Sequence, residues 1–351
     1  MVVSARELRG PGLPTAAEEQ TAEEGVPEIT DIGDLAAEPQ LQSESAAAPA
    51  DLGIEAADAA DVYKELMAAG GQVFDAAAKE YTPDPEALMG TVKRAFDSLR
   101  ESDDLLTETV RRRSKKPSWA QRAASVSILG MRLGLEVEYD ERRGLALGLC
   151  ALMHDIGMLT IPEGVLASRS LTPQQLRLLR NHPVESQRMA EEFGSSFSWI
   201  GKVVVQVHER HDGGGYPQGL SGEEIHEFAR IIGLADSYVA MSHPRADREA
   251  QVTYNALSAI VDLRNKDFHP RLIKALIQIV SIFPLGSLVR LNNNEVGRVI
   301  RTNRLHSARP LIEIMLDSHG GRVNPSRVTN LENEPMLYIV DPAIEESVLE
   351  G

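Results

Sequence analysis

The sequence lacks the features that mark secreted and membrane proteins. It contains a single cysteine, Cys150, so no disulfide can form within the chain, and a reducing compartment is the natural interpretation. The first residues lack the basic-then-apolar order of a signal peptide. The nearest approach to a membrane-spanning run, 272–289, is interrupted by Lys274, Gln278 and Pro284. We therefore predict a soluble, cytoplasmic protein with no membrane partner.

Positive charge and aromatic side chains are also scarce. The chain has 36 Lys and Arg against 52 Asp and Glu, a net charge of -16, and residues 1–50 alone hold ten acids and two arginines. An acidic chain is poorly suited to duplex nucleic acid or an anionic membrane surface, so neither partner is expected. Aromatic residues make up 5% of the chain while Ala and Leu are frequent, which favours a mainly α fold.

Composition and periodicity divide the chain into four regions. Residues 1–50 are rich in Ala, Glu, Pro and Ser without periodicity, which predicts a disordered acidic tail. Residues 51–115 are expected to form an N-terminal helical region. Residues 116–282 have helical patterns with short turns and are expected to form the main domain. The apolar periodicity changes after residue 282, and residues 283–351 are expected to form a small β domain.

Local signals place several element boundaries. Thr82-Pro-Asp-Pro-Glu86 predicts a helix start with Thr82 as the cap, and Thr172 followed by Pro173 predicts another. In the last region, 287–301 predicts two strands joined by an Asn-rich turn. A third strand is expected at 311–316, closed by a Gly-Gly pair, and a fourth at 338–340.

The first histidine of the chain is also its first candidate for chemistry. No histidine occurs before His154, which stands in the run Leu-Met-His-Asp-Ile-Gly. Neighbouring helical side chains point about 100° apart, so His154 and Asp155 reach one ion only where the helix ends. Gly157 is the residue type that ends helices. Imidazole and carboxylate together suit Fe, Mn or Zn, whereas the plain alternative is a buried helix with a polar end.

Three further residues strengthen the metal interpretation. His182 lies in the middle of the next predicted helix, His208 follows an apolar run, and Asp236 is an acid within an apolar stripe. Each one alone is more often a hydrogen-bonded core residue. Together with the His-Asp pair on successive helices they favour a buried metal site, because buried charge is costly unless it is paired or metal-bound.

A glycine-rich loop begins at His208. Its sequence, His-Glu-Arg-His-Asp-Gly-Gly-Gly-Tyr-Pro, ends at Pro217. Three glycines allow the backbone of such a loop to come close to a ligand. An ordinary surface turn is the alternative, and the position of the loop directly after a candidate ligand favours the functional interpretation.

The order of these motifs resembles the HD-GYP family, bacterial phosphodiesterases that hydrolyse cyclic di-GMP at a centre of two or three metal ions. The resemblance is carried by His-Asp-Ile-Gly157, His182-Pro183, the segment His208–Pro217 and the segment Ala229–Asp236. It covers 116–282, and the segment after Pro284 resembles a tail often appended to the family. It implies a mainly α protein: an HD-type helical bundle with N-terminal helices and a small C-terminal antiparallel β unit.

The resemblance also implies functional residues. It carries over five metal ligands, of which the first two are also the expected catalytic residues: His154, Asp155, His182, His208 and Asp236. The cofactor implied is one or two divalent metal ions, Fe or Mn. The residues expected on the substrate side are Gly215, Tyr216, Pro217, Arg245 and Arg248.

Four positions depart from the family pattern. An upstream histidine is absent, and Ser118 or Trp119 falls about where it would stand. Val207 replaces the first of two consecutive histidines, so each metal position keeps three protein ligands of four. Met158 replaces a lysine that would face a phosphate, and a thioether offers no positive charge. The family's Arg-Pro-Tyr-Arg appears here with an acid, Asp247, in the middle.

The resemblance implies an HD-GYP-type phosphodiesterase in cyclic di-GMP signalling, which hydrolyses a phosphodiester with metal-activated hydroxide. The lost ligands predict impaired activity. One alternative is a weak or inactive signalling module that acts through its Gly-Tyr-Pro surface on a GGDEF-type diguanylate cyclase. Another is a phosphohydrolase acting on a related nucleotide. A homodimer stays open.

Overall fold

The computed structural model describes residues 59–111, 117–168, 170–242, 253–263, 266–281, 283, 285–303, 306 and 308–341. The predicted mainly α fold with a small C-terminal antiparallel sheet is confirmed. The predicted acidic tail, 1–50, lies outside the described residues.

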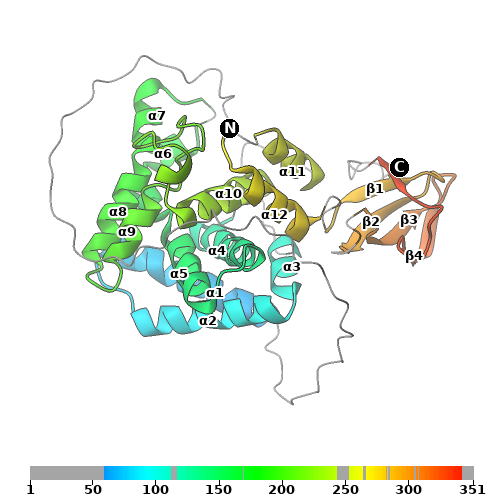
Figure 1. Ribbon diagram of the computed structural model, residues 1–351, viewed down its shortest axis with the longest axis horizontal. Coiled ribbons are helices and arrows are strands. Elements are labelled where there is room, and N and C mark those ends of the chain that lie inside the picture. The colour runs from blue at the N-terminus through cyan, green and yellow to red at the C-terminus, as the bar shows by residue number, and fades with distance from the viewer. Residues whose placement is uncertain are drawn as a thin grey trace. The chain divides into compact units, whose positions relative to one another are not determined.

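Three helices form the N-terminal region (Figure 1): α1 (Ala59–Lys79), α2 (Pro85–Glu101) and α3 (Asp104–Arg111). The predicted cap of the second helix, Thr82, is wrong. The cap is Asp84, whose Oδ1 accepts hydrogen bonds from the backbone N–H groups of Glu86 and Ala87 at 3.0 and 3.3 Å. Asp84 directly precedes Pro85, so its carboxylate reaches the unpaired amides of the first turn.

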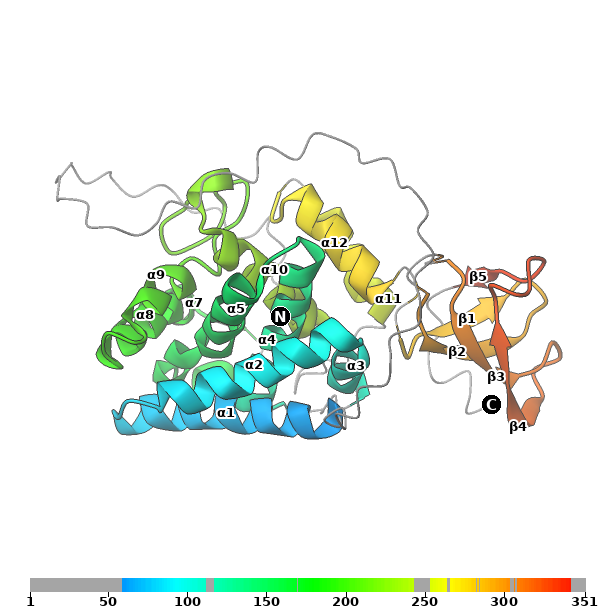
Figure 2. The same cartoon turned by 60° about the horizontal axis from the view of Figure 1, so that its bottom comes forward.

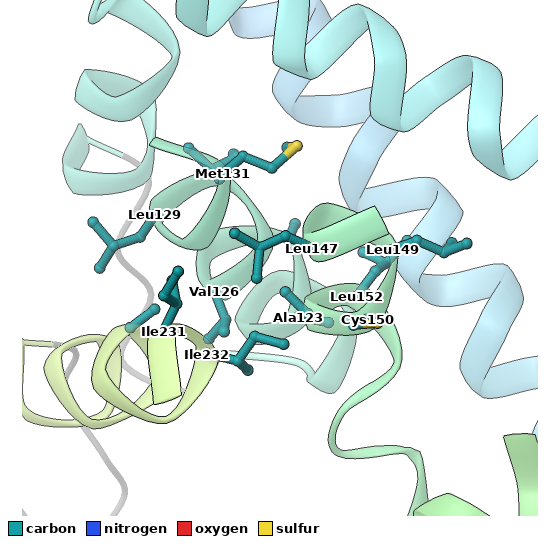
Figure 3. Close-up of a cluster of buried hydrophobic side chains, with 14 of the residues drawn as sticks. Ala123, Val126, Leu129, Met131, Leu147, Leu149, Cys150, Leu152, Ile231 and Ile232 are labelled. Atoms are coloured by element: carbon teal, nitrogen blue, oxygen red, sulfur yellow. The ribbon is translucent and has the colours of Figure 1, made fainter. Parts of the chain in front are cut away.

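Two helices make the centre of the bundle: α4 (Trp119–Glu136) and α5 (Glu141–Met153). The Ser127 hydroxyl donates to the carbonyl oxygen of Gly148 at 2.8 Å and so joins the two helices inside the core. Figure 3 shows buried side chains carried by α4, α5 and α10 (Glu227–Ser242), among them Ala123, Val126, Leu129, Met131, Leu147, Leu149, Cys150, Leu152, Ile231 and Ile232. This packing holds the C-terminal end of α5 against α10.

Short helical elements follow α5 along the chain. They are η2 (Ile156–Thr160), α6 (Glu163–Leu166), α7 (Pro173–Arg180), α8 (His182–Glu192), α9 (Ser198–Val204) and η3 (Gly222–Glu224). The predicted start at Thr172 is confirmed: its hydroxyl accepts from the backbone of Gln175, whose side chain bonds back to Thr172. The placement of His182 in the middle of a helix is wrong, because Asn181 separates α7 from α8.

The helical part closes with α10, α11 (Thr253–Asp262) and α12 (Pro270–Val280) (Figure 2). Asp236 lies on α10 and is 5% exposed. Within the part of the chain that the structure describes, no helix is both long and apolar enough to cross a bilayer.

The C-terminal β unit is one antiparallel sheet with the order β4-β3-β2-β1-β5 (Figures 1 and 2). Its strands are β1 (Leu288–Leu291), β2 (Val296–Arg301), β3 (Leu311–Leu316), β4 (Arg322–Asn330) and β5 (Ile339–Asp341). The sequence predicts four of these five strands and misses β4. Most residues of β4 are exposed, so the strand carries no apolar alternation by which it could be recognised.

Candidate metal centre

The end of α5 places two polar side chains inside the protein. His154 caps the helix, and the backbone at Asp155 turns out of helical geometry with φ -108° and ψ 14°. His154 is 1% exposed and Asp155 is 4% exposed. His154 Nε2 lies 3.5 Å from Asp155 Oδ2, so the expectation that a helix end directs both side chains to one place is confirmed.

The sequence suggested that Gly157 ends the helix, and this expectation is wrong. α5 ends at Met153, and Gly157 lies within η2. Its role is close packing. A Cβ at this position would lie 2.5 Å from the backbone N of Ser186 and would also collide with the carbonyl oxygen of His182. The backbone N–H of Gly157 donates to Ser186 Oγ at 2.9 Å. The glycine therefore lets the first turn of α8 lie against η2, which brings His182 beside Asp155.

One group of candidate ligands consists of Asp155, His182 and His208. His182 Nε2 lies 3.2 Å from Asp155 Oδ1 and 2.9 Å from His208 Nε2, and His208 Nε2 lies 3.7 Å from the same oxygen. His182 Nδ1 is 2.6 Å from the carbonyl oxygen of Leu179. Because a carbonyl only accepts, that nitrogen carries the proton and Nε2 presents its lone pair to the group.

A second group consists of His154, Asp155 and Asp236. His154 Nε2 lies 3.6 Å from Asp236 Oδ1, and His154 Nδ1 lies 2.7 Å from the carbonyl oxygen of Ala151. Nδ1 of His154 therefore donates to that carbonyl, which turns Nε2 toward the two carboxylates. Burial lowers the pKa of His154, but contacts with Asp155 and Asp236 outweigh burial and raise it. Asp155 belongs to both groups, with Oδ1 toward the first and Oδ2 toward the second. The structure thus brings together all five side chains that the resemblance singled out.

Arg122 is a part of the site that the sequence analysis missed. From the first turn of α4, its Nη2 and Nε donate to Asp236 Oδ1 at 2.7 and 3.1 Å, and Nε lies 3.7 Å from Asp155 Oδ2. Ser118 and Trp119 have other contacts: Ser118 caps α4, and the ring of Trp119 stacks on Phe74. The sequence of α4 contains two arginines, Arg122 and Arg132, and no local pattern distinguishes the one that reaches the site.

The charges of the site are set by burial and by mutual contact. Burial alone would raise the pKa of Asp155, but the charge on His154, contacts with His182 and His208, and Arg122 outweigh it and hold that pKa well below its ordinary value. Burial of Asp236 is outweighed in the same way, chiefly by Arg122, so its pKa is also lowered.

Burial of His208, together with the neighbouring His182, outweighs the opposing effect of Asp155 and Asp236 and lowers the pKa of His208 to about 4. At neutral pH the site therefore holds two carboxylates and a neutral imidazole at His208. Metal ligands must be deprotonated, so these are the protonation states that a metal ion requires.

The glycine-rich loop closes over one ligand. The ring of Tyr216 stacks on the ring of His208, with centroids 5.1 Å apart and an interplanar angle of 6°. Burial raises the pKa of the Tyr216 hydroxyl to about 12, so it is neutral. The guanidinium of Arg180, at the end of α7, lies 5.5 Å from the same ring. Tyr216 thus covers one face of His208 while Arg180 brings positive charge close to the site.

The loop backbone packs on itself. A Cβ on Gly215 would lie 2.6 Å from the backbone carbon of Glu209, so the glycine serves this close approach. The Glu209 carboxylate accepts hydrogen bonds from three successive backbone N–H groups, at Gln218, Gly219 and Leu220. Pro217 is exposed. Arg245 and Arg248, the remaining residues expected on the substrate side, lie outside the described residues.

The replaced family positions hold apolar side chains. Val207 is 1% exposed and packs in the main helical core, and Met158 is 8% exposed. Neither side chain offers a nitrogen ligand or a positive charge, so among the described residues the two groups around Asp155 have three candidate ligands each.

The arrangement fits a divalent metal ion. Asp155 Oδ1 and His154 Nε2 are buried and have no hydrogen-bond partner. An unpaired buried acceptor carries a free-energy cost that a cation would remove. Imidazole nitrogens and carboxylate oxygens are ligands that suit Fe, Mn and Zn, and the backbone carbonyls behind His154 and His182 orient the rings as supporting groups commonly do at metal sites.

Comparison with known proteins gives two family-model matches. Residues 112–272 match the model described as an HD domain, and residues 288–351 match a KOW domain associated with the HD domain. The chain is 29% identical over 236 residues to a cyclic di-GMP phosphodiesterase of Pseudomonas aeruginosa, which covers 66% of this chain and 56% of that protein. It is 37% identical over 124 residues to a 3'3'-cGAMP-specific phosphodiesterase of Vibrio cholerae, covering 34% of this chain and 27% of that protein.

The chain thus spans about half the length, or less, of these curated relatives. Among solved structures, an HDG"Y"P protein from Bdellovibrio bacteriovorus aligns with a TM-score of 0.53 at 18% identity, covering 66% of this chain and 74% of that one. This structural likeness concerns the fold.

Proposed function

Because this chain belongs to the HD-GYP family of HD-domain proteins, we propose that it is a metal-dependent phosphodiesterase that hydrolyses a cyclic dinucleotide, with cyclic di-GMP as the substrate. The observation that supports this proposal most directly is the convergence of two imidazoles on the unpartnered Oδ1 of Asp155. Named relatives of the chain act on cyclic di-GMP, and the ligand set suits the metal ions that cleave phosphodiesters.

The proposed roles follow from the geometry of each side chain. Asp155, His182 and His208 hold a divalent ion, with Fe or Mn as the proposed identity, and His154 and Asp236 form the opposite wall. When bound, the ion supplies a Lewis acid for the phosphodiester and lowers the pKa of water from 15.7 to about 7.

The chain itself contributes orientation, shielding and charge. The carbonyls of Ala151 and Leu179 fix the rings of His154 and His182 with Nε2 inward. Tyr216 covers His208 and limits the access of water to it. Arg122 offers positive charge to a phosphate, and Arg180 does so at the rim. We retain Arg245 and Arg248 as proposed phosphate contacts, and the surface around Gly215 and Pro217 as the proposed contact for a GGDEF-type partner.

A catalytically silent binding module is not favoured. The five candidate ligands lie in one buried site, and the low pKa of His208 keeps its imidazole available to a metal ion. Holding several polar groups in a buried site costs stability unless they are satisfied, so a site without function would be expected to lose them. A related nucleotide is the more specific alternative, because two relatives are named for 3'3'-cGAMP.

The test is hydrolysis by the purified chain, reconstituted with Fe(II) or Mn(II) and incubated separately with cyclic di-GMP and 3'3'-cGAMP. We expect a linear dinucleotide product from cyclic di-GMP. Asp155→Asn should lower the rate by more than about 100-fold, since altering even the supporting groups of a metal site costs about 10- to 100-fold. Asp97→Asn, which breaks an exposed ion pair with Lys93 on α2, is the matched control and should keep full activity.

Each negative result has a distinct meaning. Turnover of 3'3'-cGAMP alone would transfer the proposal to that nucleotide. Metal-loaded protein that cleaves neither nucleotide would refute the proposed function, and unchanged activity in Asp155→Asn would refute the assigned centre.

A further inference from the structure

We propose that Arg122 permanently takes the place of a cation beside Asp236, so that the centre binds one divalent ion, held by Asp155, His182 and His208, and not two. This inference deepens the proposed function and shares its premise that the site holds a metal. It assigns a role to the one cationic side chain seen to bond a candidate ligand among the described residues.

The first reason is that Arg122 already uses the atom that a second ion would need. Asp236 Oδ1 is the oxygen that faces His154 Nε2 at 3.6 Å, and it is the same oxygen that accepts two N–H bonds from Arg122. An ion that used Asp236 Oδ1 between His154 and Asp155 would compete with both of these bonds. A guanidinium keeps its proton under all ordinary conditions, so a metal ion cannot displace it by deprotonation.

The second reason is that the opposite group is not occupied in this way. Asp155 Oδ1, which faces His182 and His208, is buried without a hydrogen-bond partner. The nearest atom of Arg122 lies 3.7 Å from Asp155 Oδ2, the other oxygen of the carboxylate. One carboxylate oxygen therefore faces a fixed cation, and the other faces the Nε2 atoms of two imidazoles, which are ligands of the kind that a metal ion takes.

The third reason is charge balance. Among the carboxylates and the guanidinium alone, Asp155 and Asp236 carry two negative charges against one positive charge on Arg122. One divalent ion leaves a single net positive charge, which a phosphodiester anion neutralises. A second divalent ion would leave three net positive charges in a buried site that also lacks two family ligands. Like charges held this close in a medium of low polarity repel strongly.

Arg122 also has N–H groups to spare. A guanidinium has five N–H donors, and the two bonds to Asp236 leave others free to bind a substrate phosphate. Its side chain is 21% exposed, so it is anchored by Asp236 while remaining accessible from the site. The guanidinium thus takes over the charge of the missing ion without moving during turnover.

The test is metal content and metal spectroscopy, neither of which depends on activity. The metal-free chain is titrated with Mn(II) alone, and bound metal is measured by mass spectrometry and by electron paramagnetic resonance. Wild-type protein should bind one equivalent and show the spectrum of isolated Mn(II). Arg122→His and Arg122→Ala should each bind a second equivalent, and the histidine variant should show the spectrum of a spin-coupled pair.

Two control variants accompany the test. Arg122→Lys keeps the positive charge and should still bind one equivalent. Arg94→Ala removes an exposed arginine paired with Glu65 on α1 and should behave as wild type. Circular dichroism verifies that each variant is folded, and the wild-type stoichiometry decides the question even if a variant does not fold.

Two equivalents and a coupled spectrum in the wild type would overturn the inference. So would a second equivalent in Arg122→Lys, or a single equivalent in both folded Arg122→His and folded Arg122→Ala. Wild type that binds two ions and cleaves cyclic di-GMP keeps the proposed function while this inference fails. Wild type that binds one ion without cleaving any cyclic dinucleotide keeps this inference while the proposed function fails.

Discussion

Replacing Gly157 with alanine should damage the site through a contact that involves no ligand. The new Cβ would lie 2.5 Å from the backbone N of Ser186, whereas ordinary contacts begin near 3.4 Å, so α8 must move by at least about 0.9 Å. The carbonyl of His182 lies in the same path. Because that turn of α8 carries the imidazole of His182, the movement reaches Asp155.

The magnitude follows from two terms. Forcing an extra methyl group into a packed site costs about 1–3 kcal/mol, and weakening the bond from Gly157 N–H to Ser186 Oγ adds about 1 kcal/mol. A loss of about 2–4 kcal/mol corresponds to a melting temperature lower by about 5–12 °C for a domain of this size. Metal–ligand distances tolerate about 0.2 Å, so affinity should fall by about 10- to 100-fold or more.

The assay combines thermal unfolding in the presence of a chelator with Mn(II) titration of the folded protein. Gly164→Ala in α6 is the matched control. A Cβ there meets nothing within 4 Å, and alanine inside a helix is favoured over glycine by about 0.5–1 kcal/mol. Equal melting temperature and equal metal affinity in Gly157→Ala and wild type would refute the packing argument.

Two further predictions concern stability. Because His208 has a pKa of about 4 in the folded protein against 6.5 ordinarily, the unfolded chain takes up the proton first. Stability of the metal-free protein should therefore fall by at most about 3 kcal/mol as pH drops from about 6.5 to about 4. Urea titrations should show a flatter pH dependence for His208→Gln, and equal slopes would contradict this account. Arg132 is 4% exposed and paired with Asp103 and Glu136. Its replacement by alanine should lower the free energy of unfolding by about 1–3 kcal/mol. The metal content of the folded variant should stay unchanged. A loss of metal would show that α4 transmits the change from Arg132 to Arg122 and the candidate metal site.

Several features of this protein follow from the sequence alone because they depend on neighbouring residues. The capping box at Thr172 is one, since the hydroxyl and the amide that it accepts from lie in the same turn. A helix end beside His154 and Asp155 was also expected, although Gly157, the residue on which that expectation rested, does not end the helix. The mainly α fold and most strands follow from periodicity, which failed at β4 because that strand is largely exposed. The candidate ligands were recognised by their order along the chain, and their roles as metal ligands remain a prediction.

Only the tertiary structure shows which residues from distant parts of the sequence come into contact at the site. Arg122 and Asp236 are distant in sequence and meet only because α4 packs beside α10. Gly157 looked like a helix terminator, yet the packing of α8 is what requires it. The two carboxylate oxygens of Asp155 have different neighbours: one faces a fixed guanidinium and the other faces two imidazoles. This difference depends on distances of a few ångströms between separate helices. Residue order and propensity describe each helix by itself, whereas the charge balance of the site arises only from how the helices are packed together.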